Sequence, residues 1–227
     1  MKQKLIVVIA LLVIGLLWVQ PTLAVPVNWT DWTSATTGAP GSATGTIGAI
    51  TVNYTGDVTF AQTGSGTNYW TEYSPEPYTG NATVDNAPTA AEMVALSLSG
   101  ITNTLTFSQQ VTNPIMAIVS QGQPNLSVSY DFDASFTVLG EGRGYWGDGS
   151  YFTSPGDILT GNELHGVIQF NGTFSSISWT SSPNEYWHGV TVGLTTQAVP
   201  EPATMLLLGS GLAGIAVWRK RLGRREG

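Results

Sequence analysis

Apolar and polar residues alternate along much of the chain, and the longest such run spans residues 126–138. Apolar side chains occupy every second position from Leu126 to Val138, with Ser, Asp or Thr between them. Successive side chains of an extended chain point to opposite faces, so a period of two predicts a strand with one buried face. We expect one continuous strand over these thirteen residues.

Shorter alternating runs predict further strands on both sides of this segment. They lie at 50–54, 58–60, 94–98, 105–107, 168–170, 177–179 and 190–194. Thr55-Gly56-Asp57, between the first two runs, predicts a hairpin. Residues 115–119 are apolar throughout, which predicts a strand buried on both faces.

Taken together, these runs predict an all-β fold. Eight or more short strands joined by turns of Gly, Ser, Thr, Asn and Pro favour an antiparallel β-sandwich of jelly-roll-like type. The strand order does not follow from the pattern. Residues 61–92 break the rhythm, because they are rich in loop-forming residues yet carry several aromatic rings. We expect these rings to cover an edge of a sheet.

The N-terminus has the pattern of an export signal. A start with two lysines precedes a long apolar run, and small residues at Thr22 and Ala24 close the segment. This predicts a signal peptide over residues 1–24, cut by signal peptidase between Ala24 and Val25. A retained N-terminal anchor is the alternative.

Residues 25–198 form a body of a size suited to one domain, the predicted β-sandwich ectodomain. The body holds thirteen acidic residues and a single basic residue, Arg143. Phosphate binding depends on Lys and Arg, so we expect no nucleic-acid partner. The chain has no cysteine, which excludes disulfides, thiol nucleophiles and thiolate metal sites.

The C-terminal tail, residues 199–223, combines three features in a fixed order. Its prolines, Pro200 and Pro202, favour an extended backbone around Glu201. Residues 203–218 are uncharged and would form an apolar transmembrane helix of about 24 Å, short against a hydrocarbon core of about 30 Å. The cluster Arg219-Lys220-Arg221 follows and is expected to stay in the cytoplasm as a stop-transfer signal.

This tail resembles the PEP-CTERM sorting signal of Gram-negative bacteria. The matching residues are Val199-Pro200-Glu201-Pro202, the apolar helix with its glycine-rich middle, and Arg219-Lys220-Arg221. The resemblance implies processing by exosortase, a multi-pass membrane cysteine protease or transpeptidase, in bacteria that usually make extracellular polysaccharide. It also implies a precursor in the inner membrane with the body in the periplasm, and a mature form at the cell surface or outside the cell. An ordinary C-terminal anchor is the alternative.

The tripeptide Pro-Glu-Pro occurs a second time, at residues 75–77. No apolar helix and no basic cluster follow this copy. We therefore expect the sorting machinery to ignore it.

Few residues of the body suggest catalysis. Neither a Gly-x-Ser-x-Gly elbow nor a Walker-type loop occurs, and His165 and His188 are the only histidines. Glu163 and these histidines could supply the three ligands of a hydrolytic zinc site. Both histidines instead stand before Gly-Val at predicted strand starts, where a hydrogen bond to a neighbouring turn is the expected role. We predict no catalytic residue, no metal and no cofactor, although structural calcium among acidic turns stays open.

The loop "GEGRGYWGDGSYF" is the best ligand candidate of the body. Its glycines match Gly-x-Gly-x-x-Gly, but turn and strand rather than a helix are expected after it, so dinucleotide binding is not predicted. The predicted glycan-binding residues are Arg143, Tyr145, Trp146 and Asp148. Aromatic rings can stack on the C–H groups of sugars while charged groups bond their hydroxyls. The alternative is a hairpin in which Arg143 pairs with a neighbouring acid and Trp146 packs on the sheet.

The sequence therefore predicts an exported, non-enzymatic surface or matrix protein that exosortase sorts and that associates with exopolysaccharide. A second hypothesis is a carbohydrate-binding module with Trp146, Tyr145 and Trp70 as stacking platforms. The third is a secreted glycoside hydrolase with paired carboxylates, although no acid pair stands out in the sequence.

Overall fold

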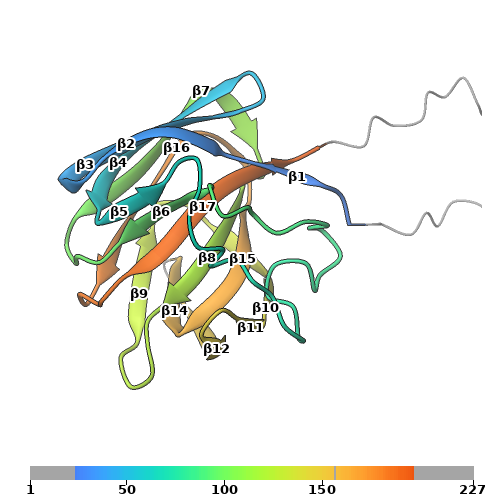
Figure 1. Cartoon of the computed structure of the whole chain (residues 1–227), viewed down its shortest axis with the longest axis vertical. Helices are drawn as coiled ribbons and strands as arrows, with labels where there is room; N and C mark the ends of the chain where they lie inside the picture. Colours follow the sequence, from blue (N-terminus) through green and yellow to red (C-terminus); the bar gives the residue numbers. More distant parts are fainter. Residues whose placement is uncertain (1–23, 156, 197–227) are drawn as a thin grey trace, which may run out of the picture. The chain divides into compact units, whose positions relative to one another are not determined.

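The structure is a computed structural model that describes residues 24–155 and 157–196, and every regular element within them is a β-strand (Figure 1). In chain order the strands are β1 (Val27–Trp29), β2 (Asp31–Thr36), β3 (Gly38–Ile47), β4 (Ile50–Val58), β5 (Phe60–Gln62), β6 (Met93–Leu96), β7 (Thr102–Thr112), β8 (Ile115–Gln121), β9 (Val128–Phe132), β10 (Phe136–Glu141), β11 (Arg143–Gly144), β12 (Gly147–Asp148), β13 (Ser150–Ser154), β14 (Ile158–Asn162), β15 (Leu164–Phe170), β16 (Thr173–Ser182) and β17 (His188–Thr195). The predicted all-β class is confirmed.

The two ends of the chain carry the predicted export and sorting signals. The predicted signal peptide up to residue 23, the motif Val199–Pro202, the apolar helix and the basic cluster lie outside the described residues. Among the residues that are described, no helix is long and apolar enough to cross a membrane.

Most strands belong to one of two antiparallel sheets. The first sheet has the order β10-β15-β8-β17-β6-β5, with β1 paired to β17, and the second has the order β13-β14-β9-β16-β7-β4-β3-β2. From β6 to β10, and again from β14 to β17, each strand lies in the opposite sheet from the strand before it. The short strands β11 and β12 form a separate hairpin.

The two sheets share one apolar core. Val52, Tyr54 and Trp179 of the second sheet and Met116 and Ile168 of the first belong to the same cluster of buried side chains. Removing this apolar surface from water is the main force that holds the two sheets together.

Most of the predicted strands are present. The alternating runs at 94–98, 105–107, 168–170, 177–179 and 190–194 fall in or beside β6, β7, β15, β16 and β17. All seven residues of β8 are buried, which confirms the prediction for residues 115–119.

The predicted continuous strand at 126–138 is wrong. Strand β9 ends at Phe132, the chain bends at Asp133, and β10 begins at Phe136 in the other sheet. At the bend, the backbone N–H and carboxylate of Asp133 bond to Ser178 in β16. Buried and exposed positions keep alternating across the bend, so the period of two does not show that the chain changes sheets.

The hairpin predicted at Thr55-Gly56-Asp57 is also wrong. Strand β4 continues through these residues, and the chain reverses before it at Gly48, where φ is 57°. Gly56 serves another purpose: a Cβ there would lie 2.4 Å from Oδ1 of Asn103, which accepts hydrogen bonds from Tyr54 and the Asp57 N–H. The glycine allows this buried side chain to approach closely.

The segment between β5 and β6 covers the outer face of the first sheet. Trp70 and Tyr78 are buried there in a second apolar cluster with Ala117 and Val119 of β8. The expectation that these rings cover a sheet edge is therefore wrong. Their position explains why β8 is buried on both faces. Because Trp70 is only 1% exposed, it cannot be a platform for a surface glycan.

Candidate functional site

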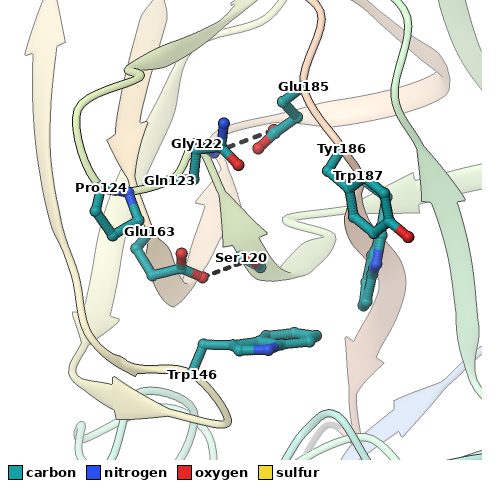
Figure 2. A pocket seen from close by; sticks show the side chains of 9 residues that line it. All are labelled: Ser120, Gly122, Gln123, Pro124, Trp146, Glu163, Glu185, Tyr186 and Trp187. Carbon is teal, nitrogen blue, oxygen red and sulfur yellow. Dashed lines mark hydrogen bonds between the residues drawn. The ribbon is translucent and has the colours of Figure 1, made fainter.

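The candidate site lies where β8 ends and its two neighbours begin. Strands β15 and β17 both pair antiparallel with β8, so their first residues flank its last ones. The turns before β15 and β17 carry Glu163 and Glu185, respectively. A pocket of about 250 Å³, here called the acidic pocket, opens between them (Figure 2). Its lining residues are Ser120, Gly122, Gln123, Pro124, Trp146, Glu163, Glu185, Tyr186 and Trp187.

Glu163 is held in the pocket wall by Ser120. The Ser120 hydroxyl donates a hydrogen bond of 2.5 Å to Oε1 of Glu163 (Figure 2). Both residues have positive φ, 59° for Ser120 and 60° for Glu163, a conformation uncommon in residues other than glycine. Burial and the nearby charge of Glu185 raise the pKa of Glu163, while the hydrogen bond from Ser120 lowers it. Strained backbone of this kind is often found at functional sites.

Glu185 is fixed by two partners, one just after the end of β8 and one at the start of β17. Its Oε1 accepts the backbone N–H of Gly122 at 3.1 Å and also contacts Nδ1 of His188. The side chains of Glu185 and His188 are only 2% and 1% exposed. The predicted bond from His188 to a neighbouring turn is thereby confirmed.

His165 lies behind Glu163 and has no exposed surface. Its Nε2 is 3.6 Å from Oε1 of Glu163, and neither ring nitrogen has a hydrogen-bond partner among the described residues. Burial lowers the pKa of His165 to about 4. The imidazole is therefore neutral at pH 7, so its contact with Glu163 is not an ion pair there. A bond from His165 to a turn, as the sequence suggested, is not found among the described residues.

Trp146 forms the floor of the acidic pocket (Figure 2). It lies in the turn between β11 and β12, and its ring is nearly parallel to those of Tyr69 and His165, with centroids 5.2 Å and 6.4 Å away. Trp187 meets Trp146 edge-on at 5.0 Å. Despite these contacts, Trp146 is still 45% exposed. These neighbours hold the ring in place and leave part of it open to a ligand.

A second hollow of about 490 Å³, here called the arginine hollow, lies beside the same tryptophan. It is lined by Tyr73, Arg143, Gly144, Tyr145, Trp146 and Gly147. Three of the four predicted glycan-binding residues thus come together, while Asp148 lines neither hollow. The Arg143 guanidinium lies 5.5 Å from the centroid of Tyr73, a cation–π contact, and no ion pair joins it to an acid among the described residues.

The second Pro-Glu-Pro supports this hairpin. The Pro75 carbonyl accepts the Arg143 N–H at 2.8 Å, and the Tyr73 N–H donates to the Arg143 carbonyl at 2.9 Å. This copy of the tripeptide therefore anchors β11.

The three residues considered for zinc do not form a metal site. His188 contacts Glu185, whereas His165 lies near Glu163. In residues 24–155 and 157–196, no group of three or more His, Asp or Glu side chains could hold a metal ion.

Sequence reasoning missed that Glu163 and Glu185 line the same pocket. A signal was present, because "ELHGV" and "EYWHGV" both place a glutamate shortly before His-Gly-Val. Recognising the pair also requires knowing that β15 and β17 flank the same strand. Of the two rings that surround Trp146, Tyr69 belongs to the aromatic rings of residues 61–92, for which the sequence predicts a position at a sheet edge, and Trp187 carried no signal of its own.

Fold and site together define an all-β protein with two hollows that share an exposed tryptophan. A family model for the PEP-CTERM protein-sorting motif matches residues 198–221, which confirms the resemblance inferred from the tail. The chain thus carries a motif that supports export and sorting by exosortase to the cell surface. No curated protein and no solved structure matches the chain.

Proposed function

We propose that this chain is a non-enzymatic cell-surface protein that binds exopolysaccharide through the two hollows beside Trp146. One observation carries the proposal: Trp146 is 45% exposed and lines both hollows, with Arg143 in one and two glutamates in the other. Concave sites with aromatic walls and a few polar groups are typical of small-molecule recognition. Sugars offer C–H groups to such rings and hydroxyls to charged side chains.

The proposed route begins with cleavage by signal peptidase between Ala24 and Val25. The precursor then stays in the inner membrane with its body in the periplasm until exosortase acts at Val199–Pro202. The mature form resides at the cell surface or in the extracellular polysaccharide. The sorting motif at residues 198–221 supports this route.

The proposed scaffold is a jelly-roll-like sandwich. Two antiparallel sheets with a shared core and strands that alternate between them support it. The role needs no cofactor, and the acidic body makes nucleic acid an unsuitable partner.

Replacing Trp146 by alanine is the test of the proposed function. Protein from producing cells is mixed with polysaccharide from the same cells, and the retained fraction is measured at several concentrations. We expect Trp146→Ala to weaken retention at least about tenfold, which corresponds to about 1.4 kcal/mol. Phe152→Ala is the matched control, because Phe152 is 57% exposed in β13 and lines neither hollow. Equal retention of wild type and Trp146→Ala would remove this site from consideration.

The presence of two glutamates, Glu163 and Glu185, in one pocket favours one second candidate, glycoside hydrolysis. Glycosidases generally use two carboxyl groups, one of which has a raised pKa and donates a proton. Burial and Glu185 raise the pKa of Glu163 in this way. The same polysaccharide samples are assayed for new reducing ends. Release that disappears in Glu163→Gln would make the protein an enzyme; the binding proposal expects no release.

A further inference from the structure

We infer that the acidic pocket selects a cationic sugar, a hexosamine unit whose amino group is free rather than acetylated. This inference rests on the proposed function, because it names the sugar class that the same site takes.

The negative charge of the residues that line the acidic pocket favours a cationic ligand. Two glutamates line the acidic pocket, and no Lys, Arg or His is among its lining residues. Arg143, the only basic residue of the body, lines the other hollow. A small hollow whose charges have one sign concentrates ligands of the opposite sign. Uronic acids are therefore disfavoured, and ammonium groups are favoured.

Of the two carboxylates, Glu163 is the more accessible to a ligand, because its side chain is 11% exposed and that of Glu185 is 2% exposed. Glu163 uses Oε1 for the Ser120 hydroxyl, and Glu185 uses Oε1 for Gly122 and His188. Among the described residues, no hydrogen bond reaches the Oε2 atom of either glutamate. An ammonium group has three donors and makes strong, charge-assisted bonds to such oxygens.

Aromatic rings line the same space. Trp146, Tyr186 and Trp187 all belong to the lining, and Tyr186 is 83% exposed. Cations are attracted to the faces of Trp and Tyr rings, and aromatic cages are a known means of binding ammonium groups. Rings and carboxylates together suit an amino sugar, which presents a ring of C–H groups and one positive charge.

His165 lies behind Glu163 and does not line the acidic pocket. It is fully buried with both ring nitrogens unpartnered among the described residues, and its Nε2 faces Glu163 at 3.6 Å. Since this imidazole is neutral at pH 7, it does not neutralise Glu163. Glu185 has His188 against its Oε1, whereas Glu163 has no cationic partner among the described residues, so the charge of Glu163 is left for a ligand to balance. A metal ion is the less suitable cation, because the described residues offer no group of three ligating His, Asp or Glu side chains.

The test compares two oligosaccharides that differ only in the amino group. Processed protein from producing cells is titrated calorimetrically, at about pH 6 where a free amine is charged, with a hexamer of β-1,4-linked glucosamine and with its fully N-acetylated counterpart. We expect the free-amine hexamer to bind at least about tenfold more tightly, since charge-assisted bonds replace neutral ones. This preference should shrink as salt is added, because salt screens the ion pair.

Glu163→Gln is expected to abolish the preference by weakening the binding of the free-amine hexamer. The amide oxygen can still accept the Ser120 hydroxyl, so the pocket wall keeps its hydrogen bond. Asp131→Asn, which removes an exposed charge from β9 in the second sheet, is the matched control and should keep the preference.

Three outcomes would overturn the inference. They are equal affinity for the two hexamers, a preference for the acetylated one, and a preference that survives Glu163→Gln. If Trp146-dependent retention of the native polysaccharide persists in such a case, the proposed function stands and only the choice of sugar is wrong. Loss of Trp146-dependent retention as well would contradict both the proposed function and the inferred sugar class.

Discussion

Gly144→Ala is expected to lower the free energy of unfolding by about 2 kcal/mol and to abolish polysaccharide retention. A Cβ at residue 144 would lie 2.3 Å from Cγ and 2.4 Å from Nδ1 of His165. His165 is fully buried, so its ring cannot move aside, and overpacking of this kind typically costs 1–3 kcal/mol. The β11–β12 hairpin would shift instead and move Arg143 and Trp146 out of place. Urea unfolding and the retention assay measure the two effects.

Two further variants test this explanation. Gly64→Ala is the matched control, because a Cβ there meets nothing within 4 Å, and we expect a change of no more than about 0.5 kcal/mol. In a His165→Ala background the added methyl group has room, so most of the cost of Gly144→Ala should disappear. An undiminished cost in that background would show that His165 is not the obstacle.

Protonation of His165 is expected to lower the free energy of unfolding by up to about 3 kcal/mol as the pH drops from about 6.5 to about 4. Burial lowers the pKa of His165 to about 4 from its ordinary value of 6.5. Between these values the unfolded chain binds a proton that the folded protein does not bind. Protonation therefore favours the unfolded state, and the stability is lost as pH falls through this window.

His165→Phe separates this effect from other titrations. Phenylalanine keeps a ring in the same place but does not titrate, so the acid-dependent loss should be largely absent from this variant. Burial raises the pKa of Glu163, so protonation of this carboxyl favours the folded state and acts in the opposite direction. Urea unfolding of both proteins at several pH values between about 4 and 7 measures the difference. Parallel pH profiles would contradict a buried, neutral His165.

The strands of this protein are largely readable from its sequence, but the places where the chain changes sheets are not. At 126–138 each apolar side chain is more buried than its polar neighbours, as the alternation predicts, yet the chain bends at Asp133 and enters the other sheet. Gly56 lies in a sequence typical of a turn, but its lack of a side chain instead leaves room for the side chain of Asn103. In both places the conformation depends on a partner from a distant strand, which a local pattern does not contain.

The part of the candidate site that comes from one stretch of sequence was predictable, and the part that depends on distant strands was not. Arg143, Tyr145 and Trp146 are neighbours in the sequence, and their chemistry marked the loop as a ligand candidate. Glu163 and Glu185 meet only because β15 and β17 flank β8. Trp70 was predicted to be a stacking platform but is buried in an apolar cluster. Nothing in its local sequence indicates this burial.

Delivery to the cell surface underlies every role proposed for this protein, and the intact mass of the protein from producing cells tests it most directly. The measurement is made with and without a working exosortase. We expect a product that starts at Val25 and ends near Val199–Pro202, found only when exosortase is active. A product that retains residues 203–227 in both strains would contradict sorting and make the tail a plain membrane anchor.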